Sequence, residues 1–245
     1  MHLKRIPSLE TIVSHEFDSN GVMFLPNSSF VVCVGAAGNP GDVLLYDALA
    51  QRPHLVRHIS DDSMNMVGVA PNGTFMVADT STGAIACSTP DLSEIGRYEG
   101  EQVTCMVPFF DSRTVLLGLH NGSILVWNPF DGRTQTLEFH PQFVTAIGKH
   151  HGGAIFASAD VTCTVAIWDA ASKALLRSFN AEHVVVTLLF NPRSQLPLIY
   201  LGSYVVDVWN YETCTQEAQL VEHSDMLLGM AVTQGIVPTT RFSFS

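Results

Sequence analysis

The chain has 245 residues, of which 47% are hydrophobic and 14% are charged, so it is long enough to bury a sizeable core and lacks the composition of a disordered protein. Its formal net charge is −11, and an acidic chain does not offer the Lys/Arg stripe that follows a nucleic-acid backbone. There is no run of about 18 apolar residues that would predict membrane insertion, and the N-terminus lacks the apolar run of a secretory signal.

The predicted elements are short β-strands separated by turns rich in Gly, Pro, Asn and Asp. No segment has the periodicity of an amphipathic helix, so the sequence predicts an all-β fold. In chain order, strands are expected at residues 6–13, 43–46, 75–78, 84–88, 115–119, 123–127, 144–147, 155–158, 164–169, 184–190, 198–201, 205–209 and 227–232.

One strand phrase recurs along the chain. TVAIWD, which contains Trp168, has relatives that contain Tyr46, Trp127 and Trp209. Trp168 and Trp209 lie 41 residues apart, and Tyr46 precedes Trp127 by 81 residues, or two such periods. The missing copy is expected near position 87, where Cys87 occupies the aromatic position. The phrase therefore predicts five copies of one repeated unit.

A four-stranded unit with a period of about 40–45 residues is typical of a propeller blade. On these phrases the chain resembles the WD40-repeat family over roughly residues 14–235, although the literal WD pair survives only at Trp168-Asp169. The acid that family members place six residues before the Trp is Asn121 in the third repeat and Thr162 in the fourth. The His–Ser/Thr–Trp–Asp hydrogen-bond set of the family is therefore expected to be degenerate.

The resemblance implies a single WD40-type β-propeller domain over residues 1–245, with about six four-stranded blades. Residues 224–245 are expected to begin a last, partial blade, and the strand at 6–13 is expected to lie outside the repeats and to close that blade. Two alternatives remain open: a short or irregular sixth blade, or a chain truncated at its C-terminus. The third-strand markers of the five complete repeats are Tyr46, Cys87, Trp127, Trp168 and Trp209.

Several aromatic residues and histidines are predicted to be structural. The three tryptophans follow the strand period, which favours packing between blades over ligand stacking. The histidines recur at blade starts, where each is expected to orient a turn by hydrogen bonding; the alternative is a set of ligands around the central channel. These predicted structural residues are Trp127, Trp168, Trp209, His140, His183 and His223.

The sequence predicts no catalytic, cofactor or metal site. It contains no GxSxG elbow and no phosphate-binding glycine loop. His150 and His151 are expected in a solvated turn with their side chains apart. His54 and His58 share one face of a strand, but a strand separation of about 13 Å is too wide for two ligands of one metal. The five cysteines are odd in number, widely spaced and without CxxC, which predicts reduced thiols in an intracellular protein, cytoplasmic or nuclear.

One face of the predicted propeller is acidic. The loops from the fourth strand to the next first strand, and from the second to the third, share this face, and they carry carboxylates but no Lys or Arg. Such a face attracts a Lys/Arg-rich segment of a partner, although an acidic protein with polar turns would give a similar pattern. The predicted protein-binding residues are Asp61, Asp62, Glu99, Glu101, Asp160, Glu182, Glu222 and Asp225.

These features favour a non-enzymatic scaffold that binds protein partners within a larger complex. The alternative is a propeller enzyme or small-ligand binder that uses the central channel, which would need titratable groups converging from several blades. A nucleic-acid reader is disfavoured by the charge.

Overall fold

The computed structural model of the chain describes residues 2–5, 10–14, 20–35, 39–191, 197–201 and 205–220. The chain divides into two compact units. Unit 1 consists of Met1–Leu117 and Leu125–Gln135, and unit 2 of Gly118–Ile124 and Thr136–Ser245.

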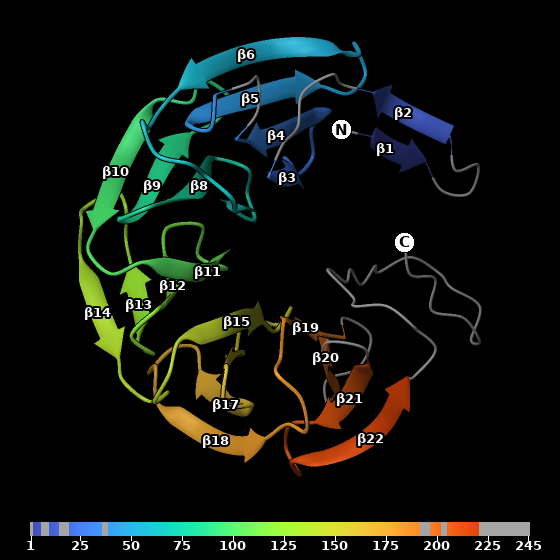
Figure 1. Ribbon diagram of the computed structural model, residues 1–245, viewed down its shortest axis with the longest axis vertical. Helices are drawn as coiled ribbons and strands as arrows, with labels where there is room; N and C mark the ends of the chain where they lie inside the picture. Colours follow the sequence, from blue (N-terminus) through green and yellow to red (C-terminus); the bar gives the residue numbers. More distant parts are fainter. Residues whose placement is uncertain are drawn as a thin grey trace. The chain divides into compact units, whose positions relative to one another are not determined.

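Within the described residues, the strands form one two-stranded sheet and five four-stranded sheets, and in each sheet the strands pair in chain order (Figure 1). The two-stranded sheet pairs β1 (His2–Arg5) with β2 (Glu10–Ser14). The first two four-stranded sheets contain β3 (Gly21–Phe24), β4 (Phe30–Val34), β5 (Asp42–Asp47) and β6 (Arg52–His58), then β7 (Val67–Val69), β8 (Phe75–Thr80), β9 (Gly83–Ser88) and β10 (Glu94–Glu99). The third contains β11 (Val103–Pro108), β12 (Val115–Leu119), β13 (Ile124–Trp127) and β14 (Thr134–Leu137). The fourth contains β15 (Val144–Lys149), β16 (Ile155–Asp160), β17 (Thr164–Asp169) and β18 (Leu175–Asn180), and the fifth β19 (Thr187–Phe190), β20 (Pro197–Leu201), β21 (Val206–Asn210) and β22 (Thr215–Leu220).

The predicted repeat marker lies in the third strand of every four-stranded sheet. Tyr46 is in β5, Cys87 in β9, Trp127 in β13, Trp168 in β17 and Trp209 in β21. The prediction of an all-β chain built from a repeated four-stranded unit is therefore confirmed.

At the N-terminus the observed strands differ from the prediction, and the predicted C-terminal blade lies outside the described residues. The strand expected over 6–13 is observed at Glu10–Ser14, and it pairs with β1, a strand the sequence did not predict. The partial blade expected over 224–245 lies outside the described residues, so a blade beyond the five described sheets remains a prediction.

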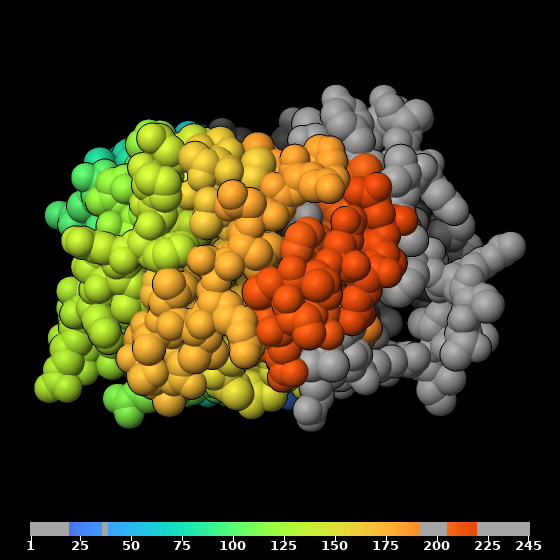
Figure 2. All heavy atoms as spheres, turned by 90° about the horizontal axis from the view of Figure 1, so that it is seen from below, coloured from blue at the N-terminus to red at the C-terminus, as the bar shows by residue number. Residues whose placement is uncertain are grey.

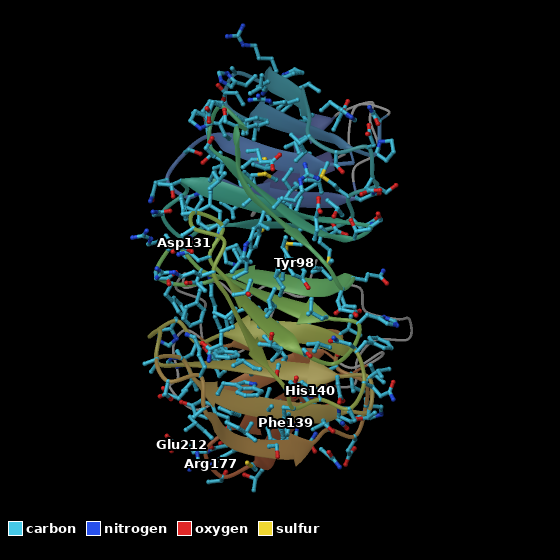
Figure 3. All side chains as sticks on the ribbon, turned by 90° about the vertical axis from the view of Figure 1, so that its left-hand side faces the viewer. Tyr98, Asp131, Phe139, His140, Arg177 and Glu212 are labelled. Atoms are coloured by element: carbon cyan, nitrogen blue, oxygen red, sulfur yellow. The ribbon has the colours of Figure 1, made fainter. Side chains whose placement is uncertain are left out.

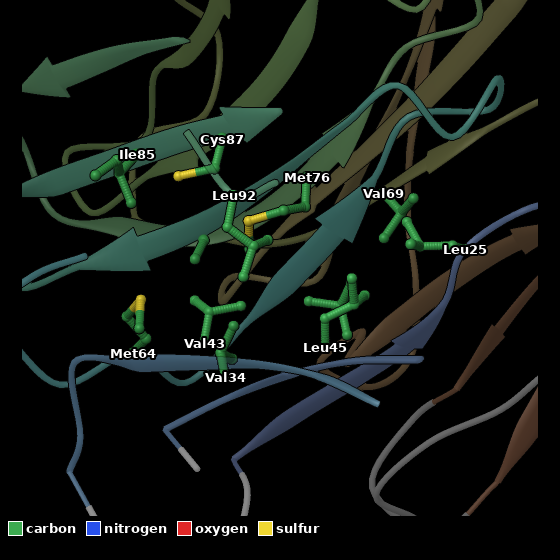
Figure 4. Close-up of a cluster of buried hydrophobic side chains, with 12 residues drawn as sticks. Leu25, Val34, Val43, Leu45, Met64, Val69, Met76, Ile85, Cys87 and Leu92 are labelled. Carbon is green, nitrogen blue, oxygen red and sulfur yellow. The ribbon is translucent and has the colours of Figure 1, made fainter. Parts of the chain in front are cut away.

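In unit 1, the core lies between the first and second four-stranded sheets (Figure 4). Alternate residues of a strand face the same side, so Val32 and Val34 of β4 meet Met76 and Ala78 of β8 in one cluster of buried side chains. Burying a side chain of this size stabilises the fold by roughly 1.5–3 kcal/mol. In unit 2, the fourth and fifth sheets pack in the same way. Ile167 of β17 and Leu188 of β19 belong to one cluster there, and a Cβ at Gly148 would stand 2.6 Å from the Leu188 carbonyl oxygen.

The residue that follows the marker aromatic forms the turn between the third and fourth strands. Asp169 Oδ1 accepts hydrogen bonds from the backbone N–H groups of Ala171, at 3.1 Å, and Ser172, at 2.7 Å. Asp47 and Asn210 accept equivalent bonds in their own turns. Either Asp or Asn supplies the required oxygen, which explains why the sequence tolerates YD and WN in place of WD.

Candidate interaction face

In unit 1, the predicted acidic residues lie where two fourth strands end: Glu99 is the last residue of β10, and the others lie on the loops that follow β6 and β10. Asp61 and Asp62 stand between β6 and β7, and Glu99 and Glu101 stand at the junction of β10 and β11. The Asp61 side chain is fully exposed, at 105% of its reference area; Glu99 and Glu101 are exposed, and Asp62 is half-buried. Residues 59–66 and 99–102 contain no Lys or Arg. We call Asp61, Asp62, Glu99 and Glu101 the acidic loops of unit 1.

Backbone hydrogen bonds fix the first acidic loop. The Ile59 N–H donates to the Gly41 carbonyl at 3.1 Å, and the Met64 N–H donates to the Pro40 carbonyl at 3.1 Å. Met64 itself is fully buried in the core of unit 1. The backbone of the loop is therefore held on both sides of Asp61 and Asp62.

A tyrosine supports the second acidic loop. The Gly100 N–H donates to the Thr82 carbonyl at 2.8 Å, and the Glu101 N–H donates to the Tyr98 hydroxyl at 3.2 Å. The Tyr98 ring centroid lies 6.5 Å from that of Trp127 (Figure 3 labels Tyr98). The marker Trp127 thus helps to position the tyrosine that carries the loop.

His58, at the end of β6, contacts two carboxylates at once. Its Nδ1 lies 2.8 Å from Asp42 Oδ1, and its Nε2 lies 3.2 Å from Asp61 Oδ1. The hydrogen bonds with Asp42 and then Asp61 raise the pKa of His58 above its ordinary 6.5. His54, four residues earlier, instead packs its ring 4.9 Å from that of Phe30. In the described part of the chain, no three His, Cys, Asp or Glu side chains are placed to hold a metal ion.

Asp160 does not lie on an exposed face. Its side chain is fully buried, and its Oδ1 accepts hydrogen bonds from the Thr162 N–H at 2.9 Å and the Thr164 N–H at 3.0 Å. Its Oδ2 lies 3.3 Å from Nδ1 of His140. Asp160 stands eight residues before the marker Trp168, and Asp79 stands eight residues before the marker Cys87. Asp79 is likewise buried, and its carboxylate accepts hydrogen bonds from the Asn65 and Met66 N–H groups at 2.7 Å. The sequence placed Asp160 among solvent carboxylates because a turn position does not reveal that its side chain points inward.

Asp160 completes a buried hydrogen-bond network that the sequence predicted to be degenerate. The Trp168 indole N–H donates to the Ser158 hydroxyl at 2.8 Å, and that hydroxyl lies 2.7 Å from His140 Nε2. Since the indole can only donate, Ser158 accepts from it and has its own hydrogen for Nε2, which leaves the His140 proton on Nδ1, towards Asp160. Burial lowers the pKa of His140 and so favours this neutral form, although Asp160 acts in the opposite direction. The expectation was wrong for this repeat because Asp160, not Thr162, occupies the acid position.

The remaining predicted residues of the acidic face, and two of the predicted structural histidines, belong to unit 2 or lie outside the described residues. In unit 2, Glu182 and His183 are both exposed. Glu222, Asp225 and His223 lie outside the described residues, so their roles stay predictions.

The tryptophans lie in buried layers rather than on the surface. Trp127 is 1%, Trp168 4% and Trp209 9% exposed. Trp168 stacks on Phe156 at 5.8 Å and meets Phe139 edge-on (Figure 3 labels Phe139 and His140). Trp209 stacks on Phe179 of β18 at 4.5 Å. Figure 2 shows the orange segment that includes β18 beside the red segment of residues 205–220 on the face of unit 2 that is in view.

His150 is not solvated, contrary to the sequence prediction. It is 7% exposed and packs edge-on against Phe190 at 5.3 Å. The His150 and His151 ring centroids are only 4.3 Å apart, so the two side chains do not diverge. Burial and then the neighbouring His151 lower the pKa of His150.

The five repeated four-stranded antiparallel sheets define the class of protein: an all-β repeat protein with a propeller-like fold. Residues 132–169 match the family model described as WD domain, G-beta repeat. Residues 132–169 thus match one WD40 repeat, and the five four-stranded antiparallel sheets are consistent with further repeats of this kind; WD40 domains in general serve as protein-interaction scaffolds. No curated protein matches the sequence. In the part of the chain that the structure describes, no helix has the length and apolar character needed to span a bilayer.

Proposed function

We propose that the chain is a non-enzymatic WD40 scaffold that binds a Lys/Arg-rich segment of a partner protein, within a larger complex, through the acidic loops of unit 1. The observation that carries the proposal is the position of Asp61, Asp62, Glu99 and Glu101 on loops that are fixed by backbone hydrogen bonds and contain no basic residue. A fixed, single-sign set of carboxylates attracts a basic segment and speeds its encounter.

The turns between third and fourth strands, at the other end of the sheets, also carry carboxylates, but they are less suited to bind a basic segment. The carboxylates of the turns between third and fourth strands, such as Asp47 and Asp169, already accept backbone N–H groups of their own turns. These hydrogen bonds lower the pKa of both groups. Basic residues, including Arg52 and Lys173, share those turns. A mixed and internally satisfied set of charges recruits a basic partner less well than the acidic loops do.

The alternative of an enzyme or small-ligand binder lacks support among the described residues, because the buried histidines belong to packing networks. His140 is tied to Ser158 and Asp160, and His150 packs on aromatic rings. We further propose that the protein works inside the cell; Cys87 and Cys163 are free thiols, as a reducing compartment allows.

The test is binding of a fluorescein-labelled oligolysine peptide, measured by anisotropy at low salt. The double variant Glu99→Lys/Glu101→Lys is expected to weaken binding by about tenfold, since two exposed charge contacts contribute up to about 1 kcal/mol each. The control Glu212→Lys/Glu217→Lys makes the same change in net charge at exposed positions of the β21–β22 region and is expected to bind nearly as the wild type does. Equal loss in both double variants would show that only net charge matters and would overturn the proposed face. The same two variants, used in affinity capture with mass spectrometry, then identify the natural partner as the protein lost selectively with the first.

A further inference from the structure

His58, the last residue of β6, stands beside the acidic loops of unit 1 and can oppose a basic partner. His58 reaches Asp61, one of the proposed binding carboxylates, through Nε2 at 3.2 Å, while its Nδ1 is held by Asp42 at 2.8 Å. Asn39 Nδ2 lies 3.2 Å from the same Nδ1. A cationic side chain of a partner would have to share or replace the contact between Asp61 and this ring.

We propose that His58 is a proton-controlled competitor for Asp61, so that the acidic loops of unit 1 bind a basic segment more weakly as the pH falls. The inference rests on the proposed function and adds its regulation. When His58 is protonated, both ring nitrogens donate to carboxylates and its positive charge neutralises part of the face. When it is neutral, the remaining proton favours Nδ1, which makes the shorter contact, to Asp42 at 2.8 Å. Nε2 then faces Asp61 as an acceptor, so the ring no longer donates to Asp61 or offsets its charge, and Asp61 is available to the partner.

The charged groups that face His58 in the described structure are the two carboxylates alone. Asp42 comes from β5 and Asp61 from the loop after β6, and they are the causes that raise its pKa. Two basic residues lie nearby. Arg57 donates to the Asp91 carbonyl at 3.0 Å and to Ser93 Oγ at 3.3 Å. Arg97 pairs with Glu94 at 3.2 Å, and its Nη2 also donates to the Ile59 carbonyl, next to His58, at 3.3 Å; both guanidinium groups keep their charge throughout the pH range of interest. Proton uptake by His58 therefore changes the charge that Asp61 presents without a compensating change from another described group.

Linkage makes the competition reciprocal. If protonation of His58 weakens binding of a basic segment, then binding of that segment must lower the pKa of His58 by the equivalent free energy. The sign is set by the raised pKa in the free protein: His58 carries its proton below that pKa and loses it as the pH rises through it. Binding is thus weakest at the acidic end of the physiological range and strengthens towards about pH 8.

The experiment measures the dissociation constant of the labelled oligolysine peptide from about pH 5.5 to pH 8, a range in which lysine with its pKa of about 10.4 stays charged. Wild-type binding is expected to tighten about three- to fivefold over this range, the size of one exposed ion pair. His58→Gln is expected to remove most of this dependence and to bind at all pH values as the wild type does at pH 8. His58→Arg, with a permanent charge, is expected to bind weakly throughout. His54→Gln, on the same strand but packed on Phe30, is the matched control and is expected to keep the wild-type dependence.

An NMR titration of the His58 ring provides a second readout that does not require a partner to be known. Its pKa is expected to fall in Asp61→Asn and to fall in wild type when oligolysine is added. If oligolysine binding depends on Glu99 and Glu101 but His58→Gln keeps the full pH dependence, the inference is wrong and the proposed function stands. If binding does not depend on the acidic loops at all, the proposed function fails and the inference fails with it.

Discussion

The indole nitrogen of Trp168 and the hydroxyl of Ser158 are joined by a buried hydrogen bond of 2.8 Å. The bond connects neighbouring strands β16 and β17, and the Ser158 hydroxyl also lies 2.7 Å from His140 Nε2; on the other side of this ring, Nδ1 lies 3.3 Å from Asp160 Oδ2. This network ties the turn before β17 and the segment before β15 to the middle of the sheet. Its loss is expected to affect the stability of the fold rather than partner binding.

Removing the central hydroxyl tests this network. Ser158→Ala leaves the Trp168 N–H and His140 Nε2 without their partner in a buried site, so it is expected to destabilise the protein by about 2 kcal/mol. Ser178→Ala on the outer strand β18, where the residue is exposed, is the control and is expected to stay within about 0.5 kcal/mol of wild type. Urea denaturation measures both. Equal midpoints for the two variants would contradict the structural role of the network.

Because His140 is buried in its neutral form, we expect the free energy of unfolding to fall at acidic pH. Its pKa is lowered from 6.5, chiefly by burial, so the unfolded chain takes up the proton before the folded chain does. The contribution of neutral His140 is fully present above the unfolded pKa near 6.5 and is lost as the pH falls towards and through the folded-state pKa. His140→Gln is expected to be less stable than wild type at pH 8, with a smaller further loss down to pH 5. Urea midpoints at several pH values measure the difference, and parallel curves for the two proteins would refute it.

The turn after Asp47 contains a strained position. Gln51 has φ of 53°, in the left-handed region that costs an L-residue about 1–2 kcal/mol. Gln51→Gly is therefore expected to stabilise the protein, by up to about 1 kcal/mol once the greater freedom of unfolded glycine is subtracted. Ala50→Gly, one residue earlier and without a positive φ, is expected to destabilise it by about 0.5–1 kcal/mol. Thermal denaturation is expected to show a higher melting temperature for Gln51→Gly and a lower one for Ala50→Gly. If both variants shift the melting temperature the same way, the conformation of the turn does not determine the effect.

Salt should weaken capture of a basic segment by the acidic loops of unit 1. The Debye length falls from about 10 Å at 0.1 M salt to about 3 Å at 1 M, which screens exposed charges such as Asp61 and Glu99. The association rate of oligolysine is expected to fall more than its dissociation rate rises, because exposed charges act mainly on encounter. Stopped-flow anisotropy at increasing salt measures both rates. A salt-independent affinity would rule out electrostatic capture.

The repeat and the strand pairing were predictable because they depend on local patterns. Short strand-like phrases ending in Tyr46, Trp127, Trp168 or Trp209 recur at a fixed period, which predicts one repeated strand, and each marker lies in the third strand of a four-stranded sheet. Even the degenerate Cys87 was found, because its spacing and not its chemistry identified the copy. The hairpin of β1 with β2 was missed because its short N-terminal strand carries no such pattern.

The candidate site was predictable only in part. The sequence predicts Asp61, Glu99 and Glu101 on exposed loops; all three are exposed, but Glu99 is the last residue of β10 and not part of a loop. Asp160 was assigned to the same kind of loop and is buried. One signal could have distinguished it: Asp160 stands in the same place as Asp79, eight residues before its marker, and a repeated acid at a fixed distance indicates a structural partner.

The sequence by itself determined the strand content, the repeat period and the sign of the charge, because these follow from residue type and spacing along the chain. Only the tertiary structure decided what each polar side chain faces. Asp160 and Asp61 are both aspartates next to a strand end, yet one is buried against His140 and the other stands in solvent beside His58. The difference arises because the tight turn after Asp160 supplies the Thr162 and Thr164 N–H groups and His140, from the segment before β15, closes over the carboxylate, whereas the loop of Asp61 leaves its side chain exposed.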